Sequence, residues 1–215
     1  MISVLLASFV TFFVAIDPVA MAPMFTTMTA RMTPAWRRQM AWKSVAIATG
    51  ILLAFAFGGA WLLEQIHVSL DAFRIAGGLL LFLIAIDMLF EKRSERREER
   101  AEQVAAEQAR HPEHQDDISV FPLAIPLIAG PGAIASIMLF FNEYESAAER
   151  GMVLLGVGAN LALCLMAFLM AGPISRVMGP TIASMLTRIF GILLAALAAQ
   201  FVVDGIRNAF GLSSP

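Results

Sequence analysis

Six stretches of this chain are long and apolar enough to cross a lipid bilayer as helices. They cover roughly residues 2–28, 43–63, 72–90, 120–141, 151–172 and 186–206. A bilayer core needs about 20 consecutive helical residues, and each stretch comes close to that length. The sequence is 59% hydrophobic, whereas soluble domains reach about 45–50%. These features predict an all-α polytopic membrane protein with six transmembrane helices.

The first and fourth stretches each contain a helix-breaking sequence near the centre, at Asp17-Pro18 and at Gly130-Pro131. Proline removes a backbone donor and clashes with the preceding turn, so a helix kinks or ends there. Within a bilayer, the freed carbonyl groups are tolerated only inside protein or beside a water-filled cavity. Paired breaks in corresponding segments of two halves are the sequence pattern of a substrate site in a secondary transporter.

A weak internal repeat relates the two breaks, with an offset of 113 or 114 residues. It aligns Asp17-Pro18 with Gly130-Pro131, Gly58 with Gly172, and Arg74-Ile75 with Arg188-Ile189. Each unit contains three spans, an odd number, so the second copy enters the membrane from the opposite side. The sequence therefore predicts two inverted three-helix repeats, 1–90 and 119–215, each beginning with a broken helix. A chance match between Leu- and Ala-rich segments is the alternative.

The segment 91–118 between the repeats is strongly charged, with six basic and nine acidic residues between 91 and 117. We expect a solvated helical linker here, with a regulatory tail as the less favoured alternative. Twelve of the fifteen Lys and Arg residues, Arg176 among them, lie in or beside alternate loops on one side of the membrane. The positive-inside rule then places the linker in the cytoplasm and both termini outside.

The breaks themselves predict a binding site made from backbone groups. Aspartate is a good helix N-cap and proline suits the first helical position, so a second half-helix should start after each break. Helix N-termini present free N–H groups and a positive dipole end, which suits an anion such as a small carboxylate. The predicted substrate-binding residues are Asp17, Pro18, Val19, Gly130, Pro131, Gly132, Ala133 and Asn160.

Asp17 is the acidic side chain expected nearest the bilayer centre, where a charge costs about 2.5–3.5 kcal/mol on insertion scales. It is a candidate to bind a coupling ion, H⁺ or Na⁺, or a substrate ammonium group, while a purely structural N-cap is the alternative. For Asn160, in the middle of the fifth span, a substrate contact and an interhelical hydrogen bond both remain open. Asp87 and Asp204 are expected near opposite membrane interfaces.

Other classes of function find no support in the sequence. It contains neither a catalytic motif nor a metal-ligand set, and it has a single cysteine, so we expect no enzyme, no metal and no cofactor apart from a coupling ion. Basic residues without interleaved aromatic residues argue against a nucleic-acid partner. The expected partners are a small solute and membrane lipid, and a homo-oligomer is compatible with the sequence.

Two segments resemble the signature sequences of the MarC (UPF0056) family. They are Ile16-Asp17-Pro18 followed by Pro23, and Pro122-Leu-Ala-Ile-Pro126-Leu-Ile-Ala-Gly130-Pro131-Gly132-Ala-Ile. The resemblance implies a six-span protein of the bacterial inner membrane, related to transporters of small neutral amino acids such as glycine and alanine. We therefore expect a secondary transporter that works by alternating access. A non-transporting membrane scaffold or assembly protein is the alternative.

Overall fold

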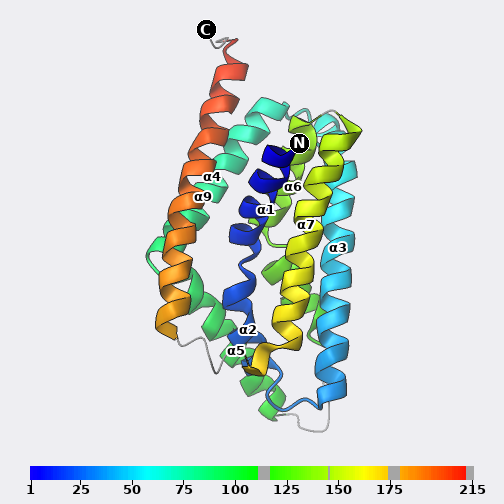
Figure 1. Cartoon of the computed structure of the whole chain (residues 1–215), viewed down its shortest axis with the longest axis vertical. Helices are drawn as coiled ribbons and strands as arrows, with labels where there is room; N and C mark the ends of the chain where they lie inside the picture. Colours follow the sequence, from blue (N-terminus) through cyan, green and yellow to red (C-terminus); the bar gives the residue numbers. More distant parts are fainter. Residues whose placement is uncertain (111–116, 145, 174–179, 212–215) are drawn as a thin grey trace.

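The computed structural model describes residues 1–110, 117–144, 146–173 and 180–211, and within these ranges it contains helices and short connections but no strand (Figure 1). Arg176 and part of the predicted linker, 111–116, lie outside the described residues. The helices are α1 (Ile2–Ile16), α2 (Pro18–Met28), α3 (Pro34–Gln65), α4 (Leu70–Leu89), α5 (Lys92–Arg110), η1 (Ser119–Ile128), α6 (Pro131–Glu143), α7 (Ala147–Leu169) and α9 (Pro180–Ala209).

All six predicted spans correspond to apolar helical segments in the structure. Five of them are long and apolar enough to span a membrane by themselves, with α1 and α2 together forming the first span. The remaining one, the fourth along the chain, is the bent pair of η1 and α6. The second span is longer than predicted, since α3 begins at Pro34 and has 32 residues. Its extra turns follow an N-cap in which the Trp36 N–H donates to Thr33 Oγ1 at 3.3 Å. The all-helical membrane architecture is therefore confirmed.

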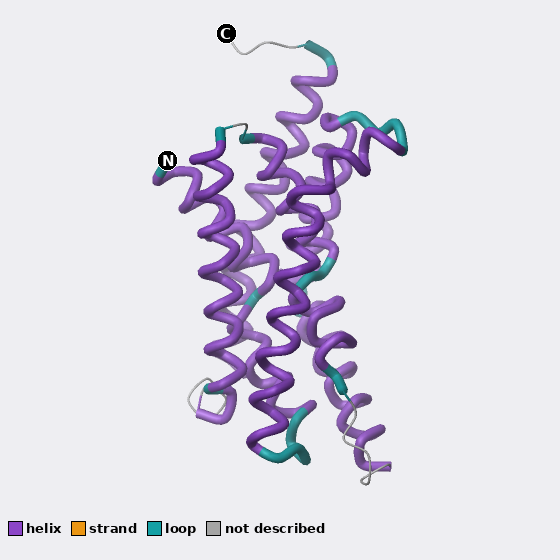
Figure 2. The backbone as a smooth tube through the Cα atoms, turned by 90° about the vertical axis from the view of Figure 1, so that its right-hand side faces the viewer, coloured by secondary structure: helices purple, strands orange, loops and turns teal. Residues whose placement is uncertain are grey.

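The structure also contains both predicted breaks, and Figure 2 shows them as short loop segments about halfway along the bundle. Asp17 separates α1 from α2 with a left-handed backbone, φ 60° and ψ 65°. The second break bends the path between η1 and α6 by 57°. Before it, η1 has wide turns closed over five residues, such as Ala129 N–H to Ala124 O at 2.9 Å. Pro122 and Pro126 have no N–H to donate to a regular helix.

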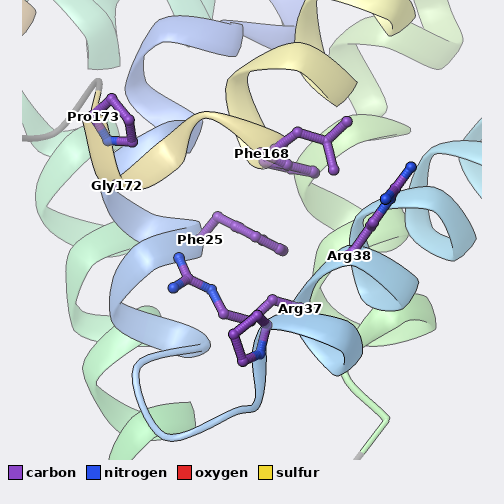
Figure 3. Close-up of a pocket in the computed structure, with 8 residues that line it drawn as sticks. Phe25, Arg37, Arg38, Phe168, Gly172 and Pro173 are labelled. Carbon is purple, nitrogen blue, oxygen red and sulfur yellow. The ribbon is translucent and has the colours of Figure 1, made fainter.

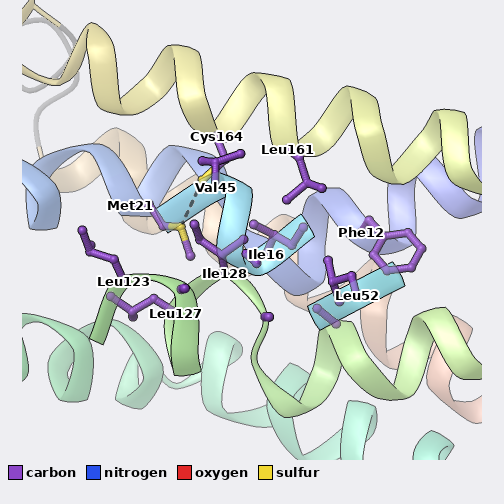
Figure 4. Packing of buried hydrophobic residues seen from close by; sticks show 14 of the residues in the cluster. Phe12, Ile16, Met21, Val45, Leu52, Leu123, Leu127, Ile128, Leu161 and Cys164 are labelled. Carbon is purple, nitrogen blue, oxygen red and sulfur yellow. Dashed lines mark hydrogen bonds between the residues drawn. The ribbon is translucent and has the colours of Figure 1, made fainter. Parts of the chain in front are cut away.

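Small residues allow close approach between helices. At Gly78 a Cβ atom would lie 2.9 Å from the Ala198 carbonyl oxygen, so α4 and α9 pack almost backbone to backbone there. The core around the first break is formed by side chains of α1, α2, α3, η1 and α7 (Figure 4). Its labelled members include Phe12, Ile16, Met21, Leu52, Ile128, Leu161 and Cys164.

Among the described residues, the two halves contain a similar succession of long helices. Each begins with a broken helix, followed by two unbroken ones: α1, α2, α3 and α4 in the first half, and η1, α6, α7 and α9 in the second. Figure 1 shows the N-terminus and the end of α9 at the same end of the bundle. Helix α5 lies toward the other end, where it packs against α2 and α4.

Candidate functional site

Asp17 forms both the end of α1 and the start of α2. Its own N–H donates to the Phe13 carbonyl at 2.9 Å, while its Oδ1 accepts from the Ala20 N–H at 3.3 Å. Aspartate tolerates left-handed backbone better than most residues because its short polar side chain bonds locally. The carboxylate is 3% exposed. The predicted N-cap is thus present, and it places a buried carboxylate at the first break.

Gly130 has the corresponding place at the start of α6, with Pro131 at the first helical position. A Cβ atom on residue 130 would lie 2.5 Å from the Pro126 carbonyl oxygen, so this approach of backbone to backbone requires glycine. The first intrahelical bond runs from Ile134 N–H to Gly130 O at 3.0 Å. Helix geometry therefore leaves the N–H groups of Gly132 and Ala133 without an acceptor inside α6.

A cavity of about 240 Å³ lies where the two breaks meet. It is formed by the end of α1, the C-terminal part of α4, the first half of α5, and the segment from η1 into α6. The lining residues are Ala15, Ile84, Asp87, Arg96, Arg97, Arg100, Pro126, Leu127, Gly130, Pro131 and Gly132. The broken helices of the two halves thus contribute to one small chamber.

Arg97 connects the charged linker to this chamber. Its side chain is 9% exposed, and its Nη1 donates to Asp17 Oδ2 at 3.4 Å. Its Nη2 donates to the Ile16 carbonyl at 3.5 Å. This carbonyl, next to the first break, thereby has a hydrogen-bond donor. Burial lowers the pKa of Arg97, and the attraction of Asp17 opposes that shift. A guanidinium from α5 therefore neutralises the carboxylate at the break.

The prediction of a solvated linker is wrong for one face of α5. Ala101, one turn after Arg97, is 1% exposed, and Val104 is half-buried against the core. These three residues follow the i, i+4, i+7 spacing of a single helix face. Ala101 and Val104 lie at helical spacing in the sequence, but a segment of this charge gave no indication that the helix would dock.

The other charges around the chamber are only partly balanced. Arg96 pairs with Asp87 at 2.9 Å, although its side chain is 67% exposed. Arg100 also lines the chamber and has no acidic partner among the described residues. With Arg97 balanced by Asp17, one arginine and the positive end of α6 remain unneutralised. The chamber is electrostatically suited to a small anionic group.

The structure places three of the eight predicted site residues in the lining of the chamber and a fourth, Asp17, beside it. Gly130, Pro131 and Gly132 line the chamber, and Asp17 contacts it through Arg97. Pro18 and Val19, in the first turn of α2, and Ala133 in the first turn of α6 are not among the lining residues. Sequence reasoning missed Arg97 and Arg100, and it assigned Asp87 to an interface away from the site.

Asn160 lies away from the lining residues, on α7 facing α1. Its Nδ2 donates to the Phe9 and Gly156 carbonyls, both at 2.9 Å. The side chain is fully buried, and its Oδ1 has no hydrogen-bond partner among the described residues. The bond to Phe9 connects α7 to α1 about two turns before the first break, and the bond to Gly156 lies within α7. Asn160 thus forms an interhelical hydrogen bond.

Apolar spans and broken helices inside the bundle define an integral membrane protein. The chain belongs to the MarC family of integral membrane proteins, whose family model matches residues 2–210. It is 36% identical over 202 residues to a UPF0056 membrane protein of Methanocaldococcus jannaschii, covering 94% of this chain and 95% of the relative. The family resemblance predicted from the two signature segments is therefore confirmed.

Two bacterial relatives have similar coverage. UPF0056 membrane protein YhcE of Escherichia coli is 36% identical over 205 residues, with 94% of this chain and 91% of the relative covered. YvbG of Bacillus subtilis is 31% identical over 215 residues, with 98% and 97% covered. No solved structure matches the chain.

Proposed function

We propose that this protein is a secondary transporter of small neutral amino acids of the glycine and alanine type, coupled to H⁺ or Na⁺. The observation that carries the proposal is the convergence of two broken helices, one from each half, on one small charged chamber. Unwound backbone beside a cavity is a feature of transporter substrate sites. A volume of about 240 Å³ lies below the ~300–1,000 Å³ of sites for drug-sized ligands.

In this proposal the solute carboxylate binds at the start of α6. The Gly132 N–H and the Arg100 guanidinium, both from lining residues, are the proposed donors, together with the Ala133 N–H in the same helical turn. A Cβ atom at Gly130 would meet the Pro126 carbonyl and one at Gly132 would meet the Ile84 side chain, so both glycines allow close packing at the edge of the chamber. The residues at the start of α2, Pro18 and Val19, belong to the half-helix that follows the first break.

Asp17 is the proposed acceptor for the substrate ammonium or for the coupling ion. In the observed structure the Arg97 guanidinium is paired with this carboxylate, so a second cation must share Asp17 with it or displace it. A tethered arginine that exchanges with substrate or ion would couple binding to movement of α5. Because α5 packs on α2, the displacement would reach a half-helix of the first break.

We further propose that residues 1–90 and 119–215 form inverted repeats that move against each other and expose the chamber alternately. The shared succession of a broken helix and two unbroken helices supports this arrangement. In the bacterial inner membrane that the family resemblance implies, the loop charges support an orientation with the linker in the cytoplasm and both termini in the periplasm.

Counterflow of radiolabelled glycine and alanine in proteoliposomes tests the proposal, with H⁺ and Na⁺ gradients imposed separately. Asp17→Asn should abolish gradient-driven accumulation. Asp204→Asn is the matched control, because that carboxylate is on α9 and accepts hydrogen bonds from Gln200. Unchanged accumulation in Asp17→Asn would remove the coupling role of Asp17.

The alternative is a membrane scaffold that does not transport. It predicts no counterflow for any member of a small amino-acid panel and a melting temperature that no member changes. Either a saturable counterflow signal or a selective thermal shift would exclude it.

A further inference from the structure

A second cavity has a volume of about 300 Å³ (Figure 3). The helix ends that form it lie at the end of the bundle opposite the N-terminus (Figure 1). It is formed where α2 ends, α3 begins and α7 ends. Its lining includes Phe25, Pro34, Arg37, Arg38, Phe168 and Leu169. None of its lining residues lines the chamber at the two breaks. It is therefore separate from the proposed transport site.

The floor of this cavity is apolar. The rings of Phe25 and Phe168 stack with centroids 4.5 Å apart and planes 16° from parallel. Both residues are buried, whereas the neighbouring Leu169 is 44% exposed. The cavity thus offers an aromatic surface continuous with an aliphatic side chain that is free to meet lipid.

Two arginines supply the polar wall. Arg37 and Arg38 belong to the second turn of α3, and Figure 3 shows their side chains diverging around the aromatic pair. Neither guanidinium has an acidic partner among the described residues. Two unneutralised guanidinium groups in one cavity suit a phosphate, because each presents several donors in a planar fork.

We propose that this cavity binds the headgroup of an anionic phospholipid. The headgroup would lie between the guanidinium groups of Arg37 and Arg38, and the upper acyl chain would lie against the exposed Leu169. Basic pockets between transmembrane helices on the cytoplasmic side are favourable sites for such headgroups. The adjoining exposed Leu169 favours a lipid over free phosphate, which would gain nothing from an apolar side chain.

The test uses the full-length protein, purified in detergent and depleted of lipid. Its melting temperature is measured as dioleoylphosphatidylglycerol is added to the micelles, and the half-maximal mole fraction gives the apparent affinity. Dioleoylphosphatidylcholine and inorganic phosphate are the comparison probes. We expect phosphatidylglycerol to stabilise the protein and both comparison probes to have little effect.

The variants separate this cavity from general surface charge. Arg37→Gln and Arg38→Gln should each weaken phosphatidylglycerol binding by roughly five-fold, equivalent to about 1 kcal/mol per basic residue. Arg31→Gln, an exposed arginine outside the cavity lining, should change nothing. Arg37→Lys combined with Arg38→Lys keeps both charges and should retain at least part of the binding.

Three results would overturn the proposal. Equal stabilisation by phosphatidylcholine would remove the selectivity for anionic lipid. Equal stabilisation by inorganic phosphate would identify a site for a soluble anion. An equal loss of binding in Arg31→Gln would indicate a diffuse attraction to the basic surface. Because the readout is lipid-dependent stability, it is independent of the proposed transport function.

Discussion

Removing one member of the Arg97–Asp17 pair should destabilise the protein far more than removing both. At the observed 3.4 Å and an effective dielectric of about 20, the attraction between unit charges is about 5 kcal/mol before desolvation is subtracted. Either Arg97→Gln or Asp17→Asn leaves the other charge buried, which costs about 3–5 kcal/mol. The double variant buries two neutral amides and should lose only about 1 kcal/mol.

Thermal unfolding of the detergent-solubilised protein measures these differences. For a chain of this length, 3–5 kcal/mol corresponds to a melting temperature lower by roughly 6–20 °C. Arg96→Gln is the matched control on the same helix. It removes an ion pair with Asp87 whose arginine is 67% exposed, so its cost should stay below about 1 kcal/mol.

The double-mutant cycle decides whether the pair acts as described. Single variants that each cost several kcal/mol and a double variant that regains most of the loss would demonstrate the buried pair. Two small and additive effects would refute the reasoning, because they would mean that water or lipid phosphate already solvates the Arg97 guanidinium. An Arg97→Gln effect no larger than that of Arg96→Gln would refute the docking of α5.

Three further predictions concern the break, the bundle and the linker. Gly130→Ala should lower both the melting temperature and counterflow, since its Cβ would lie 2.5 Å from a backbone oxygen, whereas Gly158→Ala has nothing within 4 Å to meet. Asn160→Leu should cost about 0.6–1.7 kcal/mol, the range for interhelical hydrogen bonds, with an unchanged counterflow KM. Lys43 and Ser119 lower the pKa of Asp117 from 3.8 to about 2. The stabilisation by ionised Asp117 should therefore be present above pH 4 and be lost as the pH falls toward 2, as measured by thermal unfolding.

Each of these has an outcome that contradicts it. Equal effects of alanine at positions 130 and 158 would show that the second break tolerates a side chain. A large change of KM in Asn160→Leu would return that residue to the substrate site. For the linker, Asp117→Asn should flatten the stability curve between pH 4 and pH 2, and an unchanged slope would show that other carboxylates cause it.

The positions of the breaks could be predicted because they depend on local chemistry. Proline at 18 and at 131 cannot continue the preceding helix, and Asp17 has a side chain able to cap the next one. The spans were predictable for a similar reason, since length and hydropathy decide whether a helix can cross a bilayer. The early start of α3 at Pro34 was missed, although Thr33 and Pro34 are a typical helix start.

The contents of the chamber could not be derived in this way. Arg97 lies 80 residues from Asp17 in the sequence, and no local pattern indicates that two such distant groups meet. Its burial depends on Ala101 and Val104 packing on the core, which is a property of how α5 docks. The composition of a charged segment alone predicts that the segment stays solvated.

By itself the sequence determined a helical membrane protein of the MarC family, interrupted at two positions where proline leaves backbone groups unpaired. Only the tertiary structure decided what surrounds those interruptions. Folding brings α5 against α2 and α4, so that one arginine neutralises Asp17 while Arg100 faces the start of α6 without an acidic partner among the described residues. Backbone breaks follow from the chemistry of single residues, whereas the charge balance of a cavity depends on which distant segments pack around it.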